Sequence, residues 1–517
     1  MALHRTPPVA VIGAGIAGMV AALELSGHNH EVLLLERAPT VGGKLRQVQV
    51  DGSSSDAGPT VFTLRPVFEE IFRSAGSRLA DHVRMQPLGI LARHAWNEHE
   101  RLDLHADIGQ SVAAIEAFAG AAEATGYRRF CADARTVYET LEQPFLRQSH
   151  PSLLGLMRSS GFGGLPGLLR LKPFTSLWQA LGDYFKDPRL RQLFGRYATY
   201  CGSSPWDAPA TLMLVAHVEQ EGVWQLEGGM QALAQGLRAL LLARGVHLRC
   251  ASAVERIRLQ PKGKRVAQLE LASGERLEVA AVVVTSDAAA LAAGVYGGEV
   301  ARASTKLPAT RRSLSAITWN MHVPTSGFEL LRHNVFFSPD YDREFRALAA
   351  RKLPDSPTVY VCAQDREGGQ PPAPGAPERL LCLMNAPANG DQHRYSEEEV
   401  SRCLQMTLER LRSCGLQLQP TADQQAATTP ADFHRLFPGS GGALYGQATQ
   451  GWRSSFNRPG ARTAIRGLYL AGGSTHPGPG VPMAALSGRH AARCLLQDLG
   501  SKKQSPPVAM RGGTSMH

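Results

Sequence analysis

Three glycines near the start of the chain are the first residues whose spacing indicates chemistry. Gly13, Gly15 and Gly18 follow the apolar run 9–12 in the spacing Gly-x-Gly-x-x-Gly. In such a loop Gly13 permits a tight turn, Gly15 lets the backbone approach a pyrophosphate, and Gly18 lets a helix pack close to the strand. The N-terminus of that helix directs free N–H groups and a positive dipole end at the phosphates. The spacing therefore predicts a phosphate-binding loop.

The residues that follow supply the rest of a nucleotide-binding βαβ unit. A small-residue stretch, 19–25, is expected to be helical, and residues 31–35, apolar from Val32 onward, are expected to be a second strand ending at Glu36. Glu36 lies about 20 residues beyond the glycines, where a carboxylate can accept hydrogen bonds from a ribose diol. The alternative is a βαβ unit that binds no ligand.

A second glycine pair favours a flavin over a nicotinamide cofactor. Gly42, Gly43 and the basic Lys44 come just after the expected ribose-binding strand. Such a loop suits a buried cofactor that is held permanently, and a basic residue behind it can meet a phosphate. We therefore expect FAD.

A glycine-rich block near the end of the sequence resembles the other half of such a site. The apolar run 468–471 leads into Gly472 and Gly473, and a small-residue helix is expected to begin near Pro482. Proline is tolerated in a first helical turn because its missing N–H would have no partner there. The remaining N–H groups could hydrogen-bond an anionic flavin ring and stabilise the reduced flavin. The alternative is an ordinary strand-to-helix turn.

Composition describes a globular protein with a basic excess. The chain has 517 residues, of which 43% are hydrophobic and 19% charged, which is enough for two or three domains or two interleaved ones. Its net charge of +10 is compatible with an anionic membrane surface, an acidic partner, or simply a solvated basic surface. No zinc-ligand spacing or RNA-binding aromatic motif is present, so we expect neither a metal nor a nucleic acid to be bound.

Cysteine usage and hydropathy point to a reduced compartment. None of the eight cysteines forms a C-x-x-C pair, which favours a cytosolic protein without disulfides. The first strand is expected from about Val9, which leaves no room for a signal peptide. No uncharged apolar run reaches the about 18 residues that a transmembrane helix requires.

The coarse pattern of elements alternates along the chain. We expect residues 80–225 to be mainly helical and 371–377 to be a surface loop. The tail 501–517 is expected to be disordered. Further helices are expected at 65–75, 230–244 and 397–414, strands at 246–249, 253–257, 280–284, 358–362 and 379–385, and a hairpin around Gly274.

Five blocks of the sequence resemble the carotenoid desaturases of the phytoene-desaturase family. They are 11–18, 36–44, 56–60, 227–233 and 468–489, in the order in which the family has them. The resemblance implies FAD dependence and an α/β fold of the amine-oxidase type, in which a Rossmann-like FAD/NAD(P)-binding domain is interleaved with a mixed α+β substrate domain. The implied division is 1–80, 224–300 and 456–500 for the FAD-binding domain, 81–223 and 301–455 for the substrate domain, and 501–517 for the tail.

The resemblance also assigns site residues. The implied cofactor-binding residues are Gly13, Gly15, Gly18, Glu36, Gly43, Lys44, Gly58, Pro59, Thr60, Val254, Gly472, Gly473, Val481, Pro482 and Met483. His476 is the best acid/base candidate because its motif adjoins the expected flavin turn, although a histidine in such a turn is often a hydrogen-bonding brace. Asp56 is interpreted as a turn-forming or capping residue, and His217 with Glu219 as structural or exposed.

Within the family, the block 480–489 is most similar to the purple-bacterial hydroxyneurosporene and methoxyneurosporene desaturases. Those enzymes introduce the C-3,4 double bond into acyclic 1-hydroxylated carotenoids. Desaturation removes a hydride and a proton from adjacent carbons; a flavin can accept the hydride, and the neighbouring alkene stabilises a developing allylic cation, so a strong base is not obligatory. One departure is the serine run 53–55, where the family often has an aromatic residue.

Two other interpretations stay open. On the same scaffold the chain could be a phytoene or neurosporene desaturase or a carotene isomerase. It could also be a flavin-free escort protein that binds a lipid or prenyl chain, against which the intact glycines and Glu36 argue. The electron acceptor is not indicated.

The segment 143–182 is the expected membrane contact. It contains no acidic residue, and Arg147, Arg158, Arg170 and Lys172 are interleaved with leucines and aromatics. A basic, apolar segment broken by glycine and proline suits a membrane interface, so we expect a cytoplasmic protein bound peripherally to the inner or photosynthetic membrane. The alternative is a helical lid over an internal core.

Overall fold

The computed structural model describes residues 7–28, 30–149, 172, 174–261, 263–366, 372–451, 454 and 456–500. Most of the expected membrane-contact segment, 150–171, and the tail 501–517 lie outside the described residues.

A five-stranded parallel sheet is built from segments far apart in the sequence. Its order is β19-β13-β1-β2-β9. The strands are β1 (Val9–Ile12), β2 (Val32–Leu35), β9 (His247–Arg249), β13 (Ala281–Val284) and β19 (Leu468–Leu470). Strands β1, β2 and β13 are apolar throughout and buried along their whole length, as expected of a parallel sheet covered on both faces.

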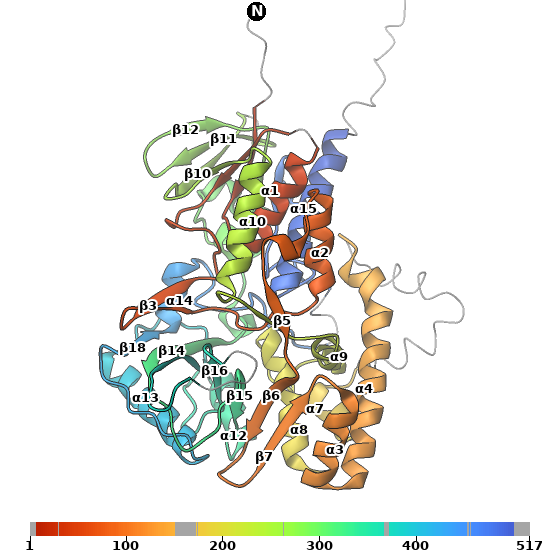
Figure 1. Cartoon of the computed structure of the whole chain (residues 1–517). Helices are drawn as coiled ribbons and strands as arrows, with labels where there is room; N and C mark the ends of the chain where they lie inside the picture. Colours follow the sequence, from red (N-terminus) through yellow and green to blue (C-terminus); the bar gives the residue numbers. More distant parts are fainter. Residues whose placement is uncertain are drawn as a thin grey trace, which may run out of the picture.

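Different layers cover the two faces of this sheet (Figure 1). On one face lie the helices α1 (Ile16–Ser26), α2 (Arg65–Ser74), α10 (Gln231–Ala243) and α15 (Val481–Gly500). On the other lies a three-stranded antiparallel sheet of β10 (Val254–Leu259), β11 (Val266–Leu271) and β12 (Arg276–Glu278). The predicted hairpin around Gly274 is the β11–β12 turn, so that expectation is confirmed.

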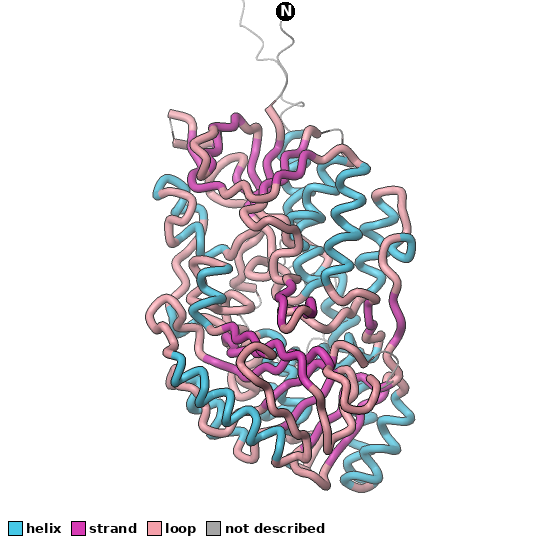
Figure 2. Tube along the Cα trace, turned by 60° about the vertical axis from the view of Figure 1, so that its left-hand side comes forward, coloured by secondary structure: helices cyan, strands magenta, loops and turns pink. Residues whose placement is uncertain are grey.

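A second, mixed sheet has seven strands in the order β18-β14-β17-β16-β15-β6-β7. It lies at the opposite end of the molecule from the parallel sheet, with loops between the two (Figure 2). Its strands are β6 (Ile90–Ala95), β7 (Arg101–His105), β14 (Ser315–Val323), β15 (His333–Phe336), β16 (Val359–Ala363), β17 (Glu378–Ala386) and β18 (Gln425–Thr428). Helices α12 (Tyr341–Ala349) and α13 (Glu397–Arg412) lie at the same end of the molecule as this sheet (Figure 1).

A separate helical core lies beside the second sheet. It contains α3 (Ile108–Ala119), α4 (Ala121–Leu141), the π-helical turn Glu142–Leu146, α7 (Leu177–Leu181), α8 (Pro188–Gly195) and α9 (Leu214–Gln220). Within the described residues, none of the helices has the length and apolar character needed to cross a membrane.

The expectation that residues 80–225 are mainly helical is wrong for 85–105. Strand β5 (Met85–Pro87) pairs with β8 (Trp224–Leu226), and β6 pairs with β7 and β15. Their partners lie far away in the sequence, so local propensity did not reveal them. The serine run 53–55 likewise forms part of β4 (Ser53–Asp56), which pairs with β3 (Gln47–Val50).

Candidate cofactor and substrate cavity

A cavity of about 1360 Å³ lies between the two sheets. Its walls come from the carboxyl ends of the parallel strands, from one face of the mixed sheet, and from α9 and α15. Every predicted cofactor-binding residue except Gly18 lines it. The carboxyl edge of a parallel sheet is where ligands bind in open α/β folds.

The glycine motif forms the phosphate end of the cavity. Helix α1 begins at Ile16, with Gly15 as its N-cap, no side-chain cap and no acidic residue in the first turn. Its first N–H groups and dipole are thus available to an anion, and Ile16 and Ala17 line the cavity. Gly18 acts behind this surface, because a Cβ there would lie 1.9 Å from the carbonyl oxygen of Gly13.

The second glycine pair, Gly42 and Gly43, packs against the first and narrows the phosphate end of the cavity. Gly42 bridges to Gly15, and its N–H donates to the carbonyl of Ala14 at 2.9 Å. A Cβ on Gly43 would lie 3.1 Å from the Gly15 Cα, whereas a Cβ on Gly15 would have 3.9 Å to its nearest neighbour. The backbones form a cradle that any side chain would fill, which fits a group bound against bare backbone.

Two backbone hydrogen bonds fix the carboxylate of Glu36 at the edge of this cradle. Its Oε2 accepts from the N–H of Ala14 at 2.7 Å, and its Oε1 accepts from the N–H of Ala38 at 2.8 Å. The side chain is buried and still lines the cavity. A fixed carboxylate beside a phosphate cradle fits a ribose diol.

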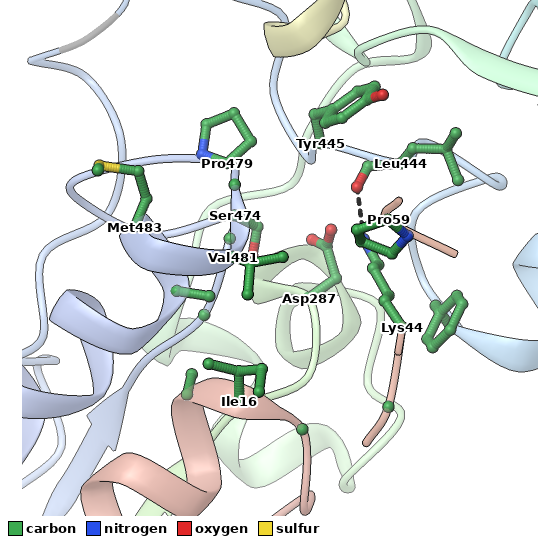
Figure 3. Close-up of a pocket in the computed structure, with 18 of the residues that line it drawn as sticks. Ile16, Lys44, Pro59, Asp287, Leu444, Tyr445, Ser474, Pro479, Val481 and Met483 are labelled. Atoms are coloured by element: carbon green, nitrogen blue, oxygen red, sulfur yellow. Dashed lines mark hydrogen bonds between the residues drawn. The ribbon is translucent and has the colours of Figure 1, made fainter. Parts of the chain in front are cut away.

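The side chains of Lys44 and Asp287 point into the same part of the cavity, beside Pro59 (Figure 3). The ammonium of Lys44 donates to the carbonyl of Leu444 and lies 5.3 Å from the centroid of the Phe437 ring. Burial lowers the pKa of Lys44 and raises the pKa of Asp287, and each charge opposes the shift of the other. Sequence reasoning gave Asp287 no role, although its place at the end of an apolar strand was the available signal.

The third wall is the N-terminus of α15. Val481, Pro482 and Met483 open this helix and line the cavity, so the helix begins as the sequence predicted. Arg458, which the sequence did not indicate, is buried beneath the preceding loop. Its guanidinium donates to the carbonyl of Gly473 in that loop at 3.4 Å and to the carbonyls of Tyr445 at 3.1 Å and Gln447 at 2.7 Å, and so joins the two segments.

His476 is not among the residues that line the cavity. Its Nε2 lies 2.9 Å from the carbonyl oxygens of both Phe145 and Gln148, and its ring stacks on His490 at 5.9 Å. These contacts tie the glycine-rich turn to the π-helical turn after α4. Such contacts hold two segments of the chain together, as a structural histidine does.

Asp56 has the capping role that the sequence predicted. It is buried, and its Oδ2 accepts from the N–H of Met230 at 2.5 Å while its Oδ1 accepts from the Gln47 amide at 3.1 Å. Burial raises the pKa of this carboxyl, and the hydrogen bond from Met230 opposes the shift. Asp56 thereby joins the start of α10 to the β3–β4 hairpin.

The rest of the cavity is largely apolar. One face of the mixed sheet contributes alternate residues of β17, namely Leu381, Leu383 and Asn385. The facing wall consists of Leu141, Phe145, Leu146, Leu212, Leu214, Val215 and Val218. This half has the character of a tunnel for a hydrocarbon chain.

A polar cluster interrupts this apolar half, and sequence reasoning missed it. Tyr197 and Tyr200 both donate to the carboxylate of Glu219 at 2.9 Å, and Arg196 donates to the hydroxyl of Tyr200 at 3.1 Å. Burial raises the pKa of Glu219, with Arg196 opposing the shift. Glu219 was expected to be structural or exposed, but it lines the cavity; its neighbour His217 is buried against the Tyr138 ring.

Phe174 marks where the cavity meets the surface. It lines the cavity and is nevertheless 82% exposed. Two of the four predicted membrane-binding cations are in ion pairs: Arg147 with Glu70 at 2.7 Å and Lys172 with Asp183 at 2.6 Å. Arg158 and Arg170 lie outside the described residues.

Among the residues that the structure describes, no group of three or more histidine, cysteine or acidic side chains could hold a metal ion. All eight cysteines are free thiols.

Comparisons with known proteins agree with this geometry. Residues 16–496 match the family of flavin containing amine oxidoreductases. The chain is 50% identical over 513 residues to the hydroxyneurosporene desaturase of Rubrivivax gelatinosus, covering 99% of this chain and 97% of that one. It is 42% identical to the hydroxyneurosporene desaturase of Cereibacter sphaeroides, covering 96% and 99%.

A solved structure shows the same fold at low identity. Cyclohexylamine oxidase from Brevibacterium oxydans superposes with a TM-score of 0.55 at 14% identity, covering 96% of this chain and 100% of that one. The parallel sheet, the mixed sheet and the cavity between them are thus those of an amine-oxidase-type fold. The chain belongs to the flavin-containing amine oxidoreductases and, within them, to the hydroxyneurosporene desaturase family.

Proposed function

We propose that this protein is an FAD-dependent desaturase that introduces a C-3,4 double bond into acyclic 1-hydroxylated carotenoids. The observation that carries the proposal is the continuity of one cavity, which joins a nucleotide cradle at the parallel sheet to a long apolar space at the mixed sheet. The relatives that share most of the chain's length are named hydroxyneurosporene desaturases, which supports the choice of substrate.

The nucleotide half fits FAD part by part. The N-terminus of α1 would face the pyrophosphate, Glu36 would accept from the adenosine ribose, and the N–H groups at the start of α15 would face the flavin ring. When bound, FAD supplies the hydride acceptor that a desaturation needs. At Gly43 and Gly473 the cavity is lined by closely packed backbone without side chains, which suits a permanently held cofactor.

We assign the acid/base role to Glu219 in place of His476. Of the described carboxylates that line the cavity, Glu36 and Glu255 belong to the nucleotide end, and Asp287 lies near Lys44. Glu219 faces the apolar half, where a carbon–hydrogen bond would be broken. Its carboxylate takes the proton that leaves the substrate, while the two tyrosine hydroxyls hold it in place.

The carotenoid enters from a membrane surface in this proposal. A hydrocarbon substrate resides in lipid, and the cavity reaches the surface at the exposed Phe174. Peripheral binding would let the substrate pass from lipid to the cavity without crossing water. We place the protein at the cytoplasmic face of the inner or photosynthetic membrane.

One experiment separates the proposal from its rivals. Purified protein is incubated with 1-hydroxyneurosporene, neurosporene and phytoene in liposomes, and the products are measured by absorption spectrum and mass. The proposal expects a red shift and the loss of two hydrogens (about 2 mass units) with the hydroxylated substrate. Preferential conversion of phytoene, or a spectral change without a change in mass, would contradict it and indicate a phytoene desaturase or an isomerase.

The cofactor is checked on the same preparation. Denatured protein should release FAD, detected by fluorescence, in a ratio near one per chain. Protein that converts nothing and contains no flavin would support the escort-protein alternative. Recovery of a nicotinamide dinucleotide alone would contradict the assignment of FAD.

A further inference from the structure

A small polar pocket lies on the mixed-sheet wall of the cavity. Tyr360 marks the cofactor side of this wall, because its hydroxyl lies 2.7 Å from Oγ1 of Thr60. Tyr360 pairs with Leu383 across β16 and β17. Two residues along from this pair stand Thr358 and Asn385, which also line the cavity. One two-residue step along a strand moves about 7 Å away from Tyr360 on the same face.

Buried hydrogen bonds give this pocket a fixed shape. The hydroxyl of Thr358 donates to Oε2 of Glu344 at 2.6 Å and accepts from the N–H of Ser338 at 3.1 Å. Glu344 is only 1% exposed, and its Oε1 has no hydrogen-bond partner among the described residues. The side chain of Asn385 opposes the rise that burial causes in the pKa of this carboxyl, and its amide offers the cavity both a donor and an acceptor.

Tyr341, on the same helix as Glu344, has a hydroxyl that lacks a partner. Tyr341 lines the cavity at the start of α12, is buried, and its Oη has no hydrogen-bond partner among the described residues. Its ring packs among aromatic side chains, including Trp178 and Trp206. A buried hydroxyl in an apolar setting loses free energy unless it is hydrogen-bonded, so the orphan donor calls for a polar group on the ligand.

We propose that Tyr341, Asn385 and Thr358, the last held in place by Glu344, bind the tertiary hydroxyl group at C1 of the carotenoid. The Tyr341 hydroxyl donates to the substrate oxygen, and the Asn385 amide oxygen accepts from the substrate hydroxyl. Glu344 is a positioning residue that acts through Thr358.

The distance of this pocket from the cofactor side of the wall matches the distance between the C1 hydroxyl and the reacting carbons, which rests on the proposed function. In a 1-hydroxylated carotenoid the oxygen stands only a few covalent bonds from C3 and C4. The hydroxyl must therefore bind within several ångströms of the reacting carbons, and the pocket lies one strand step from Tyr360. A substrate without the hydroxyl would leave these polar groups unpaired, which is a strong source of discrimination.

The test compares Tyr341→Phe with wild type on 1-hydroxyneurosporene and on neurosporene. The substitution keeps the ring and removes only the orphan hydroxyl. We expect the ratio of kcat/KM for the hydroxylated over the unhydroxylated substrate to fall about tenfold, with flavin content unchanged. Asn385→Leu should lower the same ratio. Tyr127→Phe is the matched control, because its buried hydroxyl accepts from Gln220 at 3.2 Å away from the cavity lining.

A ratio that stays within twofold of wild type in both Tyr341→Phe and Asn385→Leu would overturn the hydroxyl site. Equilibrium binding, followed by quenching of tryptophan fluorescence, separates that failure from failure of the proposed function. If wild type binds both carotenoids and desaturates neither, the proposed function fails. The hydroxyl site stands in that case only if Tyr341→Phe weakens binding of the hydroxylated carotenoid alone.

Discussion

At the scale of single residues, two glycines of one motif carry different constraints. A Cβ at Gly18 would lie 1.9 Å from the backbone oxygen of Gly13, so even alanine must displace the helix. Gly15 has φ −74° and ψ 178°, which any residue adopts, and a Cβ there meets nothing closer than 3.9 Å. Gly18 is thus needed by the fold, and Gly15 by whatever occupies the cavity.

This difference gives a first prediction. Gly15→Val should fold but lose FAD, because its methyl groups enter the phosphate passage, and its melting temperature should fall to that of the apoprotein. Gly18→Ala should lower the melting temperature of the apoprotein itself. Flavin per chain and thermal unfolding, each measured with and without added FAD, check both variants. Stoichiometric flavin in Gly15→Val would refute the phosphate-loop assignment.

A second prediction compares His476 with Glu219. His476→Asn should retain activity within about tenfold, because the histidine braces a turn, whereas Glu219→Gln should cost about 10²-fold or more in kcat with flavin retained. Burial raises the pKa of Glu219, so a base role requires activity to fall as the pH drops through a value above the ordinary one for glutamate. The kcat–pH profile checks the sign. An acid limb that persists unchanged in Glu219→Gln would exclude this residue as the base.

Residues that belong to a local motif were predicted from the sequence, whereas residues whose role depends on packing between distant segments were not. Gly13 and Gly43 are found from spacing, since the turn they make is local. Glu219, Arg458 and Tyr341 have roles only because tertiary packing brings them to one cavity. No local pattern marks a glutamate on a short helix as a cavity wall.

At the scale of elements, a buried arginine joins three helices of the cofactor-binding half. Arg489 on α15 contacts Glu24 on α1 at 2.6 Å and Glu70 on α2 at 2.5 Å. The side chains of Arg489 and Glu24 are 7% and 14% exposed. The same helix α15 places Met483 at the cavity, so its position matters to the site.

The third prediction follows from that burial. Arg489→Met should lower the free energy of unfolding by about 3 kcal/mol, because it leaves the Glu24 carboxylate buried without its cation. Arg462→Met is the matched control: Arg462 pairs with Asp498 on the same helix at 3.0 Å, but both side chains are at least one-third exposed, so about 1 kcal/mol or less is expected. Urea unfolding of the apoproteins measures both. Equal losses would show that the buried contact is worth no more than a surface pair.

Elements with strong local signals were predicted, and those defined by pairing were not. Helix α10 and the strand–turn–helix around α1 carry both periodicity and glycine punctuation. Strands β6 and β14 were missed, and each takes its place from partners distant in the sequence, such as β15 and β17. Sheet order is set by these long-range contacts, which a single sequence does not display.

At the scale of the whole molecule, the cavity exists because the chain crosses repeatedly between two sheets. The parallel sheet takes strands from three distant stretches, and the mixed sheet takes β6 and β7 from between them. The predicted interleaving agrees with this topology, although the proposed domain boundaries stay predictions. The cofactor end is closed by glycine loops, and the apolar half reaches the surface at Phe174.

The last prediction concerns membrane contact at this opening. The sequence predicts that four cations and many apolar side chains contact the membrane together, but Arg147 and Lys172 are engaged in ion pairs, which reduces their attraction to anionic lipid. The exposed ring of Phe174 is then the stronger described contribution, since burying such a side chain in lipid gains about 2 kcal/mol. Phe174→Ser should therefore weaken co-sedimentation with anionic liposomes about tenfold or more and slow turnover of liposome-borne carotenoid, with FAD content unchanged.

Leu242→Ser, at an exposed apolar position on α10, is the control that should bind as wild type does. High salt should reduce wild-type binding only in part, because the apolar contribution is not screened. Binding that disappears in high salt, or survives undiminished in Phe174→Ser, would show that another surface docks.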